Sequence, residues 1–114
     1  IILYFYTDWC QYCNKMKNTT LKDLKIIELI NKEYYFLEWN GENKDDVKFE
    51  HKIFKFKPNG FDTGIHELIL YFAGKDEKVE YPSLYVFDNK YVRQKSISSY
   101  MNTSDFLIWL ADQK

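Results

Sequence analysis

The two cysteines of this chain lie three positions apart, where an apolar segment gives way to a helical one. Cys10 and Cys13 are the only cysteines in the 114 residues. The apolar run 1–6 before them is typical of a strand buried on both faces, and the lysine-rich segment after them favours a helix. The sequence therefore predicts a strand followed directly by a helix, with the first sulfur over the N–H groups of the helix N-terminus.

This position gives the pair a distinct chemistry. The partial positive charge of a helix N-terminus favours the thiolate form of Cys10 over the thiol. Cys13 lies one turn further along, close enough to form a disulfide with Cys10. The pair therefore combines an activated nucleophile with a resolving thiol, as thiol–disulfide exchange requires. We expect Cys10 to be the exposed attacking sulfur and Cys13 the shielded one.

Three other interpretations of the pair remain open. A purely structural disulfide between cysteines so close in sequence closes a small loop and gives little entropic stabilisation. A structural zinc site needs four ligands, and the only histidines, His51 and His66, lack the usual ligand spacing. Two inert buried thiols are the third alternative. The position of the pair in an expected βαβ unit favours redox activity over all three.

Length and charge limit the other function classes. A chain of 114 residues suits one domain, 1–114, with one core. Sixteen basic and 17 acidic residues nearly cancel, so no basic stripe indicates nucleic-acid binding. No apolar run approaches the roughly 20 residues of a membrane span. The sequence begins inside the first expected strand, so we expect further residues before Ile1, and whether they form a signal peptide, a lipid anchor or another domain stays open.

Apolar periodicity predicts an alternation of strands and helices. The expected strands are 1–6, 34–39, 83–87 and 91–97, the last two joined at 88–90. The expected helices extend from the cysteine pair to about Asn18, over Ile26–Ile30, over Ile65–Phe72 and over Phe106–Ala111. The expected caps are Thr20 or Asp23, then Thr63 and Gly74, then Asn102 or Thr103.

Residues 41–62 exceed what this alternation needs. Val47 and Phe49 alternate with charged residues, as do Phe54 and Phe56, which predicts a β-hairpin with its end at Pro58. The element order predicts an α/β fold with a central mixed four-stranded sheet and helices on both faces, plus this inserted hairpin. The hairpin either modulates partner choice or covers a sheet edge. Its charged residues are expected to form a solvated face.

Two stretches resemble the thioredoxin-like family. Asp8-Trp9-Cys10-Gln11-Tyr12-Cys13 resembles the family's redox motif, and Tyr81-Pro82 with the strand Ser83–Phe87 resembles its cis-proline loop. The resemblance covers nearly the whole chain, with 41–62 as an extra segment. It is nearest to bacterial envelope thiol–disulfide oxidoreductases such as the C-terminal domain of DsbD.

The resemblance implies a thiol–disulfide oxidoreductase of the bacterial periplasm or cell envelope. Cys10 would attack and Cys13 would resolve, without a cofactor or a metal. The expected partners are protein thiols and disulfides and a redox partner protein. We expect the chain to be a monomer that binds no nucleic acid, with no membrane span in this segment. The residues expected to contact substrate are Trp9, Gln11, Tyr12, Tyr81 and Pro82.

The alternatives to these roles stay open. Pro82 could be an ordinary turn proline, and Trp9, Tyr12 and Tyr81 could be only hydrophobic surface. The motif contains little besides the helix N-terminus to stabilise a thiolate, which predicts a reductase or isomerase with a potential near roughly −200 to −270 mV. A non-catalytic binding or chaperone-like module is the alternative function.

One position departs from the family pattern. Tyr4 stands where many thioredoxins carry a buried acid, and a tyrosine is a poor base near neutral pH. Glu38 could substitute for that acid, although a solvated residue at a sheet edge is the interpretation we favour. We expect His51 and His66 to be surface residues.

Overall fold

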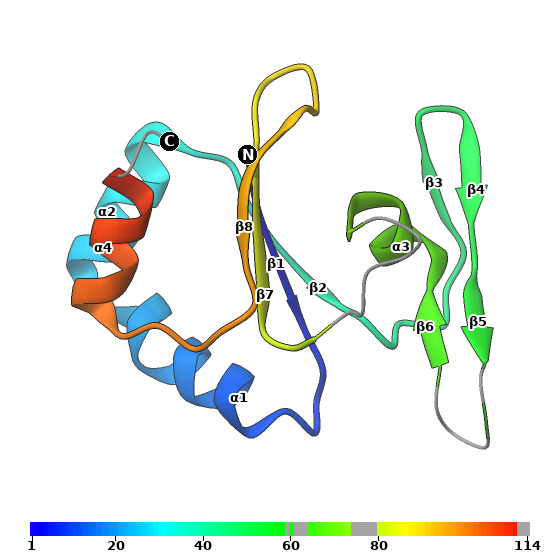
Figure 1. The fold of residues 1–114 in the computed structure, drawn as a ribbon, viewed down its shortest axis with the longest axis horizontal. Helices are drawn as coiled ribbons and strands as arrows, with labels where there is room; N and C mark the ends of the chain where they lie inside the picture. The colour runs from blue at the N-terminus through cyan, green and yellow to red at the C-terminus, as the bar shows by residue number, and fades with distance from the viewer. Residues whose placement is uncertain (59, 61–63, 74–79, 112–114) are drawn as a thin grey trace.

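The computed structural model describes residues 1–58, 60, 64–73 and 80–111 (Figure 1). Its centre is a four-stranded sheet with the strand order β2-β1-β7-β8. β1 runs parallel to β2 and antiparallel to β7, which in turn runs antiparallel to β8. The expected mixed sheet is thus confirmed, although β2 and β8 begin later than predicted. The strands are β1 (Ile2–Tyr6), β2 (Phe36–Asn40), β7 (Ser83–Phe87) and β8 (Arg93–Ile97).

Helices α1, α2 and α4 cover one face of this sheet (Figure 1). The chain passes through α1 (Gln11–Asn18), a short 3₁₀ turn and α2 (Leu24–Glu33) between β1 and its parallel neighbour β2. The side chain of Asp23 caps α2, because it accepts a 2.9 Å hydrogen bond from the backbone N–H of Lys25. Asn102 caps α4 (Thr103–Ala111) in the same way, through the N–H of Asp105 at 2.8 Å. These contacts decide between the caps that the sequence allowed.

The opposite face carries α3 and two small antiparallel ribbons (Figure 1). The first ribbon pairs β3 (Val47–Phe49) with β4 (Lys52–Phe54). The second pairs β5 (Phe56–Pro58) with β6 (Gly64–His66). α3 (Glu67–Ala73) follows β6 directly. Helices therefore lie on both faces of the sheet, as expected.

The predicted hairpin is confirmed for β3 and β4, but the sequence prediction was wrong after it. Phe56 does not belong to that hairpin, and Pro58 does not end the strand pairing. Both lie in β5, opposite β6. Ile65, expected in the helix, lies in β6. The predicted caps Thr63 and Gly74 lie outside the described residues.

His66 explains where α3 begins, and it corrects a second prediction. Its side chain is fully buried rather than at the surface. The ring Nδ1 accepts a hydrogen bond from the N–H of Leu68 at 3.1 Å, so His66 caps the helix that starts at Glu67. The ring Nε2 lies 2.8 Å from the carbonyl oxygen of Asp45. A histidine that satisfies two backbone groups is stable inside the protein, whereas His51 at the β3–β4 turn is exposed as expected.

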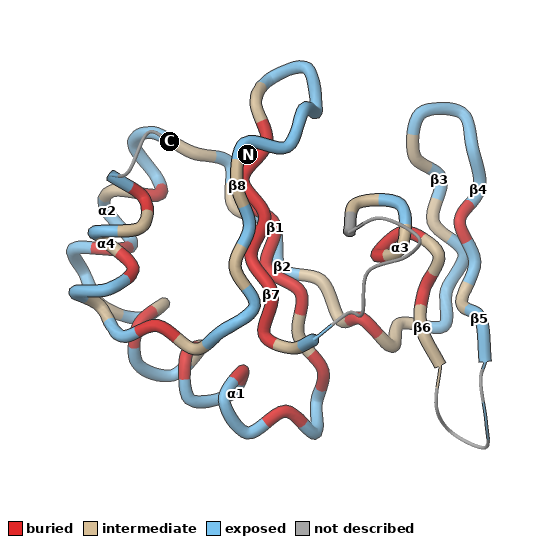
Figure 2. Tube along the Cα trace, in the orientation of Figure 1, coloured by how far each residue is buried: buried red, intermediate tan, exposed pale blue. Residues whose placement is uncertain are grey.

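The core divides into two clusters, because successive residues of a strand face opposite sides of the sheet. Ile2 and Tyr4 of β1 face the helices, where they join a cluster that includes Met16, Ile26 and Phe106. The alternate strand positions form a smaller cluster with α3 on the other side, made of Leu3, Phe5, Tyr85, Phe87 and Ile69. Figure 2 shows β1 and β7 buried between the two layers, with the ribbons largely at the surface. Within the described residues, no helix is both long and apolar enough to cross a membrane.

Candidate active site

Cys10 and Cys13 form a disulfide at the start of α1, with Cα atoms 5.2 Å apart. Cys10 is the N-cap residue of this helix, and its Sγ accepts a hydrogen bond from the N–H of Cys13 at 3.1 Å. The predicted placement of the first sulfur over a helix N-terminus is therefore observed. The expectation of an exposed Cys10 does not hold in this oxidised form, because its residue is only 5% exposed, against 1% for Cys13.

No charged side chain in the first turn of α1 opposes a negative sulfur at its start. The first turn contains no acidic side chain, and Lys15 and Lys17 lie in the last turn. Both lysines lie over aromatic rings of the surface rather than extending freely into solvent. Lys15 Nζ is 4.9 Å from the ring centroid of Tyr100, and Lys17 Nζ is 4.0 Å from that of Tyr6. Cys10 itself lies at the helix N-terminus, whose partial positive charge favours a thiolate there.

Trp9 and Tyr81 lie together beside the disulfide. Their ring centroids are 6.0 Å apart in an edge-to-face arrangement. The Tyr81–Pro82 peptide bond is cis, and Pro82 is buried while Trp9 is 67% exposed. A contact of Trp9 with Tyr81 brings the proline loop to the redox motif across a large sequence distance.

A second aromatic pair lies at the other end of the motif. Tyr12, which precedes Cys13, is exposed, and its ring centroid is 6.3 Å from that of Tyr100 in the loop before α4. Gln11 is exposed at the first position of α1. We call Trp9, Tyr81, Tyr12 and Tyr100 the aromatic rim.

Glu42 and Gly41, which the sequence did not single out, complete this rim on the Trp9 side. Trp9 Nε1 donates a 3.0 Å hydrogen bond to Glu42 Oε1. Gly41 is buried against the ring of Tyr81, where a Cβ atom would come within 2.6 Å of ring carbons. Only a glycine permits this close approach. The dipeptide Asn40-Gly41, which is typical of a turn, is the one sequence signal for this contact, and nothing in the sequence points to Glu42.

Tyr4 is buried under the redox helix, and its hydroxyl donates a 2.9 Å hydrogen bond to the carbonyl oxygen of Cys13. Burial raises the pKa of the phenol far above its usual value, and the nearby charge of Glu38 raises it further. Tyr4 is therefore a neutral hydrogen-bond donor. Glu38 is exposed on the edge strand β2, 3.9 Å from Lys17 Nζ, as expected for a solvated edge residue.

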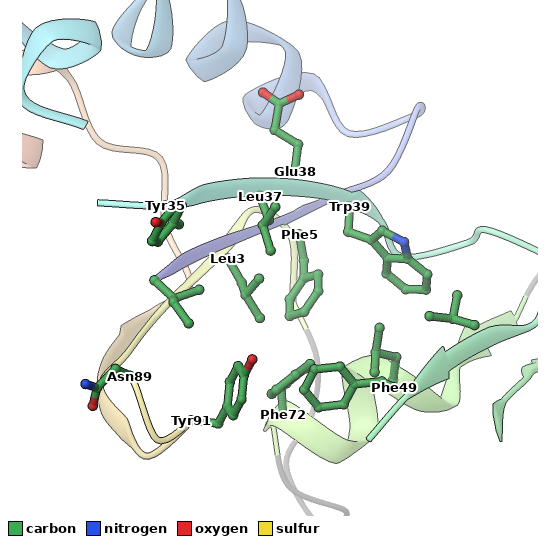
Figure 3. A pocket seen from close by; sticks show the side chains of 13 residues that line it. Leu3, Phe5, Tyr35, Leu37, Glu38, Trp39, Phe49, Phe72, Asn89 and Tyr91 are labelled. Carbon is green, nitrogen blue, oxygen red and sulfur yellow. The ribbon is translucent and has the colours of Figure 1, made fainter. Parts of the chain in front are cut away.

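A separate cavity of about 710 Å³ lies between the sheet and the first ribbon (Figure 3). Neither cysteine and no member of the aromatic rim lines it. Side chains from β1 and β2 point into it, and side chains from β3, α3 and the β7–β8 turn face them, while Glu38 points away (Figure 3). The labelled apolar and aromatic lining residues are Leu3, Phe5, Tyr35, Leu37, Trp39, Phe49, Phe72 and Tyr91. Among the described residues, no cluster of three or more potential metal ligands is present.

Residues 1–114 match the family model of the thioredoxin-like domain. The chain belongs to the thioredoxin-like domain family. No curated protein sequence gives a significant match.

Solved structures of Dsb proteins have a similar fold. A DsbH oxidoreductase superposes with a TM-score of 0.65 at 15% identity, covering 96% of this chain and 67% of that one. The oxidised C-terminal domain of Neisseria meningitidis DsbD gives a TM-score of 0.65 at 18% identity, over 100% and 79% of the two chains. Its reduced form gives 0.65 at 19% identity, over 100% and 80%. A disulfide-forming CxxC pair in this fold supports thiol–disulfide oxidoreductase chemistry in general.

Proposed function

We propose that this protein is a thiol–disulfide oxidoreductase that reduces or isomerises disulfides in other proteins. The observation that supports this proposal most directly is the hydrogen bond from the N–H of Cys13 to Cys10 Sγ at the start of α1. The same N–H, with the helix dipole, stabilises a thiolate at Cys10 once the disulfide is reduced. The buried Cys13 lies within bonding distance of that sulfur, as a resolving thiol must.

The reaction proceeds in two exchanges. The Cys10 thiolate attacks one sulfur of the substrate disulfide, whose S–S bond breaks, and the departing substrate thiolate takes up a proton. Cys13 then loses its proton to water and attacks Cys10 Sγ, which releases the second substrate thiolate. Two electrons have passed from the cysteine pair to the substrate, and the protein is left with the Cys10–Cys13 disulfide. A redox partner protein supplies the dithiol that reduces it again.

Tyr4 has a supporting part in this scheme. Its neutral hydroxyl holds the Cys13 carbonyl, and so fixes the first turn of α1 on the sheet. A phenol with a strongly raised pKa does not accept the proton of Cys13, so that proton passes to water. Trp9, Gln11, Tyr12, Tyr81 and Pro82 form the surface on which the substrate polypeptide lies.

Insulin reduction and partner trapping test the proposal. The reduced protein should reduce insulin, and Cys13→Ser should accumulate mixed disulfides through Cys10 because the resolving step is lost. Cys10→Ser is the matched control and should trap nothing. Equal trapping by the two variants would mean that the assignment of roles to the two cysteines is wrong. No reduction by the intact protein would favour the non-catalytic binding module instead.

We further propose that the protein acts as a monomeric single domain in the bacterial periplasm or envelope, on the reducing side of the exchange. Its thioredoxin-like fold and likeness to Dsb structures support this placement. Equilibration with glutathione should give a potential near roughly −200 to −270 mV. A value near roughly −120 mV would instead indicate a disulfide donor.

The ribbons are proposed to influence the choice of partner. Deleting residues 43–57 should spare the reduction of small disulfides and weaken capture of the native partner. A milder variant joins Asp46 to Lys55 through Asn-Gly, which is feasible because Val47 lies opposite Phe54 in the ribbon. Unchanged capture by both variants would leave the ribbons with a structural role only.

A further inference from the structure

Glu42 holds a carboxylate at the edge of the aromatic rim. Its Oε1 accepts the hydrogen bond from Trp9 Nε1 at 3.0 Å. A carboxylate can accept about four hydrogen bonds, so this contact leaves most of its capacity for a ligand. Burial and the negative charge of Glu42 raise the pKa of Tyr81 to about 12, so the neighbouring phenol stays neutral near neutral pH. The carboxylate and the hydroxyl lie close enough to interact electrostatically.

The backbone under Glu42 is fixed. The N–H of Gly41 donates to the carbonyl oxygen of Tyr6 at 2.7 Å, next to the redox motif. The N–H of Glu42 donates to Asn40 Oδ1 at 2.8 Å. Gly41 is also covered by the ring of Tyr81. The carboxylate is therefore placed beside Trp9 before any ligand arrives, which reduces the entropy lost on binding.

The two ends of the motif differ in charge. At the Trp9 end, Glu42 bonds Trp9 and acts electrostatically on Tyr81, and the exposed Asp8 directly precedes Trp9. At the other end, the pair Tyr12 and Tyr100 has the ammonium group of Lys15 over the ring of Tyr100. A cation is thus attracted to the Trp9 end and repelled from the Tyr12 end.

We infer that Glu42 and Trp9 form a subsite for an arginine or lysine side chain that flanks the reactive cysteine of the substrate polypeptide. Trp9 is 67% exposed, and its indole offers an aromatic face for a cation. The carboxylate beside it supplies the counter-charge, in a geometry that a guanidinium matches well. This inference rests on the proposed exchange function and adds the class of substrate.

A set of disulfide peptides tests the subsite. Each peptide has one cysteine in a disulfide with a small thiol and one variable residue on either side of it: arginine, neutral citrulline or glutamate. On one of the two sides, arginine should raise kcat/KM for reduction about fivefold over citrulline, and glutamate should lower it. The preference should shrink as salt is added, because the subsite is exposed.

Glu42→Gln should abolish the arginine preference, so that the arginine and citrulline peptides are reduced with equal kcat/KM. The amide retains an oxygen that can accept the Trp9 hydrogen bond, so the variant removes charge and little else. Glu28→Gln removes an exposed carboxylate on α2 and is the matched control, with the preference intact. Equal rates for the three peptides, or a preference that survives Glu42→Gln, would overturn the inference.

A failure of the proposed function gives a different result. The reduced protein would then leave every peptide intact, including the citrulline peptide. In that case the same peptides with serine in place of cysteine are titrated against the oxidised protein. If the arginine peptide binds more tightly than the citrulline peptide, and Glu42→Gln removes this difference, the subsite is still supported. Equal affinities for the two peptides would overturn it.

Discussion

The two faces of the central sheet are completed in different ways. On one face, three described helices enclose a continuous cluster of buried side chains, and the redox helix α1 is one of them. On the other, the short α3 and two ribbons enclose a smaller cluster and leave a cavity of about 710 Å³ beside it. The helical face therefore fixes the cysteine pair, whereas the ribbon face can change with less effect on the fold.

The largest expected effect comes from truncating the same residue type on the two faces. Ile26 of α2 and Ile69 of α3 are both fully buried. Ile26→Ala should lower the free energy of unfolding by about 4 kcal/mol, because the closed cluster around it cannot relax. Ile69→Ala should cost about 2 kcal/mol, because the adjoining cavity gives its neighbours room to move. Urea titration measures both losses, provided that the dependence of the free energy of unfolding on urea concentration (the m-value) is the same in the two variants. Equal losses would mean that the two faces are equally well packed.

The next effect concerns the contact between the helical face and the cysteine pair. Tyr4→Phe removes the hydroxyl that donates a hydrogen bond to the Cys13 carbonyl oxygen. The free energy of unfolding should fall by about 2 kcal/mol, because the buried carbonyl is left without this partner. Tyr6→Phe, on the same strand, is the matched control and should cost less than about 0.5 kcal/mol. The pH profile of insulin reduction should not change in Tyr4→Phe, because a neutral phenol is not the base. A shift of that profile would give Tyr4 a role in proton transfer.

A smaller effect is expected at Tyr81 in the proline loop, whose ring packs on Gly41 between β2 and the first ribbon. Burial, helped by the charge of Glu42, raises the pKa of Tyr81 from about 10 to about 12. The neutral phenol is the favoured form in the folded state, so its contribution is complete below pH 10 and is lost as the pH rises towards 12. Because Tyr81 is only half-buried, solvent screening weakens the effect, and the wild type should lose roughly 1 kcal/mol more than Tyr81→Phe between pH 9 and pH 11.5. Parallel stability curves for the two proteins would contradict this.

The sequence predicted the helical face well and the ribbon face poorly, for a physical reason. Local periodicity and capping determine the helices and strands around Cys10, and side chains such as Asp23 act on backbone groups within a few residues. The ribbon face depends on contacts between distant segments. His66 is buried because it bonds Asp45, and β5 pairs with β6 because the two segments meet in space.

The same distinction applies to the candidate site. The cysteine pair could be found from its spacing and its position between a strand and a helix. Glu42 could not, because its contact with Trp9 joins residues 33 positions apart and depends on where the insertion leaves β2. Tyr100 was missed for a similar reason, since it reaches Tyr12 from the loop before α4.

The smallest expected effect is confined to the first ribbon, at its turn. Glu50 and His51 both have positive φ angles, 51° and 67°, between the paired residues Phe49 and Lys52. A two-residue turn of this kind favours Asn-Gly, and neither glutamate nor histidine is well suited to it. Replacing Glu50-His51 with Asn-Gly should therefore stabilise the ribbon by about 1 kcal/mol. Hydrogen exchange should slow at the amides of β3 and β4 and stay unchanged on the helical face. The rate of insulin reduction should also stay unchanged, because the cysteine pair lies on the helical face. Slower exchange throughout the sheet would instead show that the ribbon unfolds together with the core, and that the two faces form one cooperative unit.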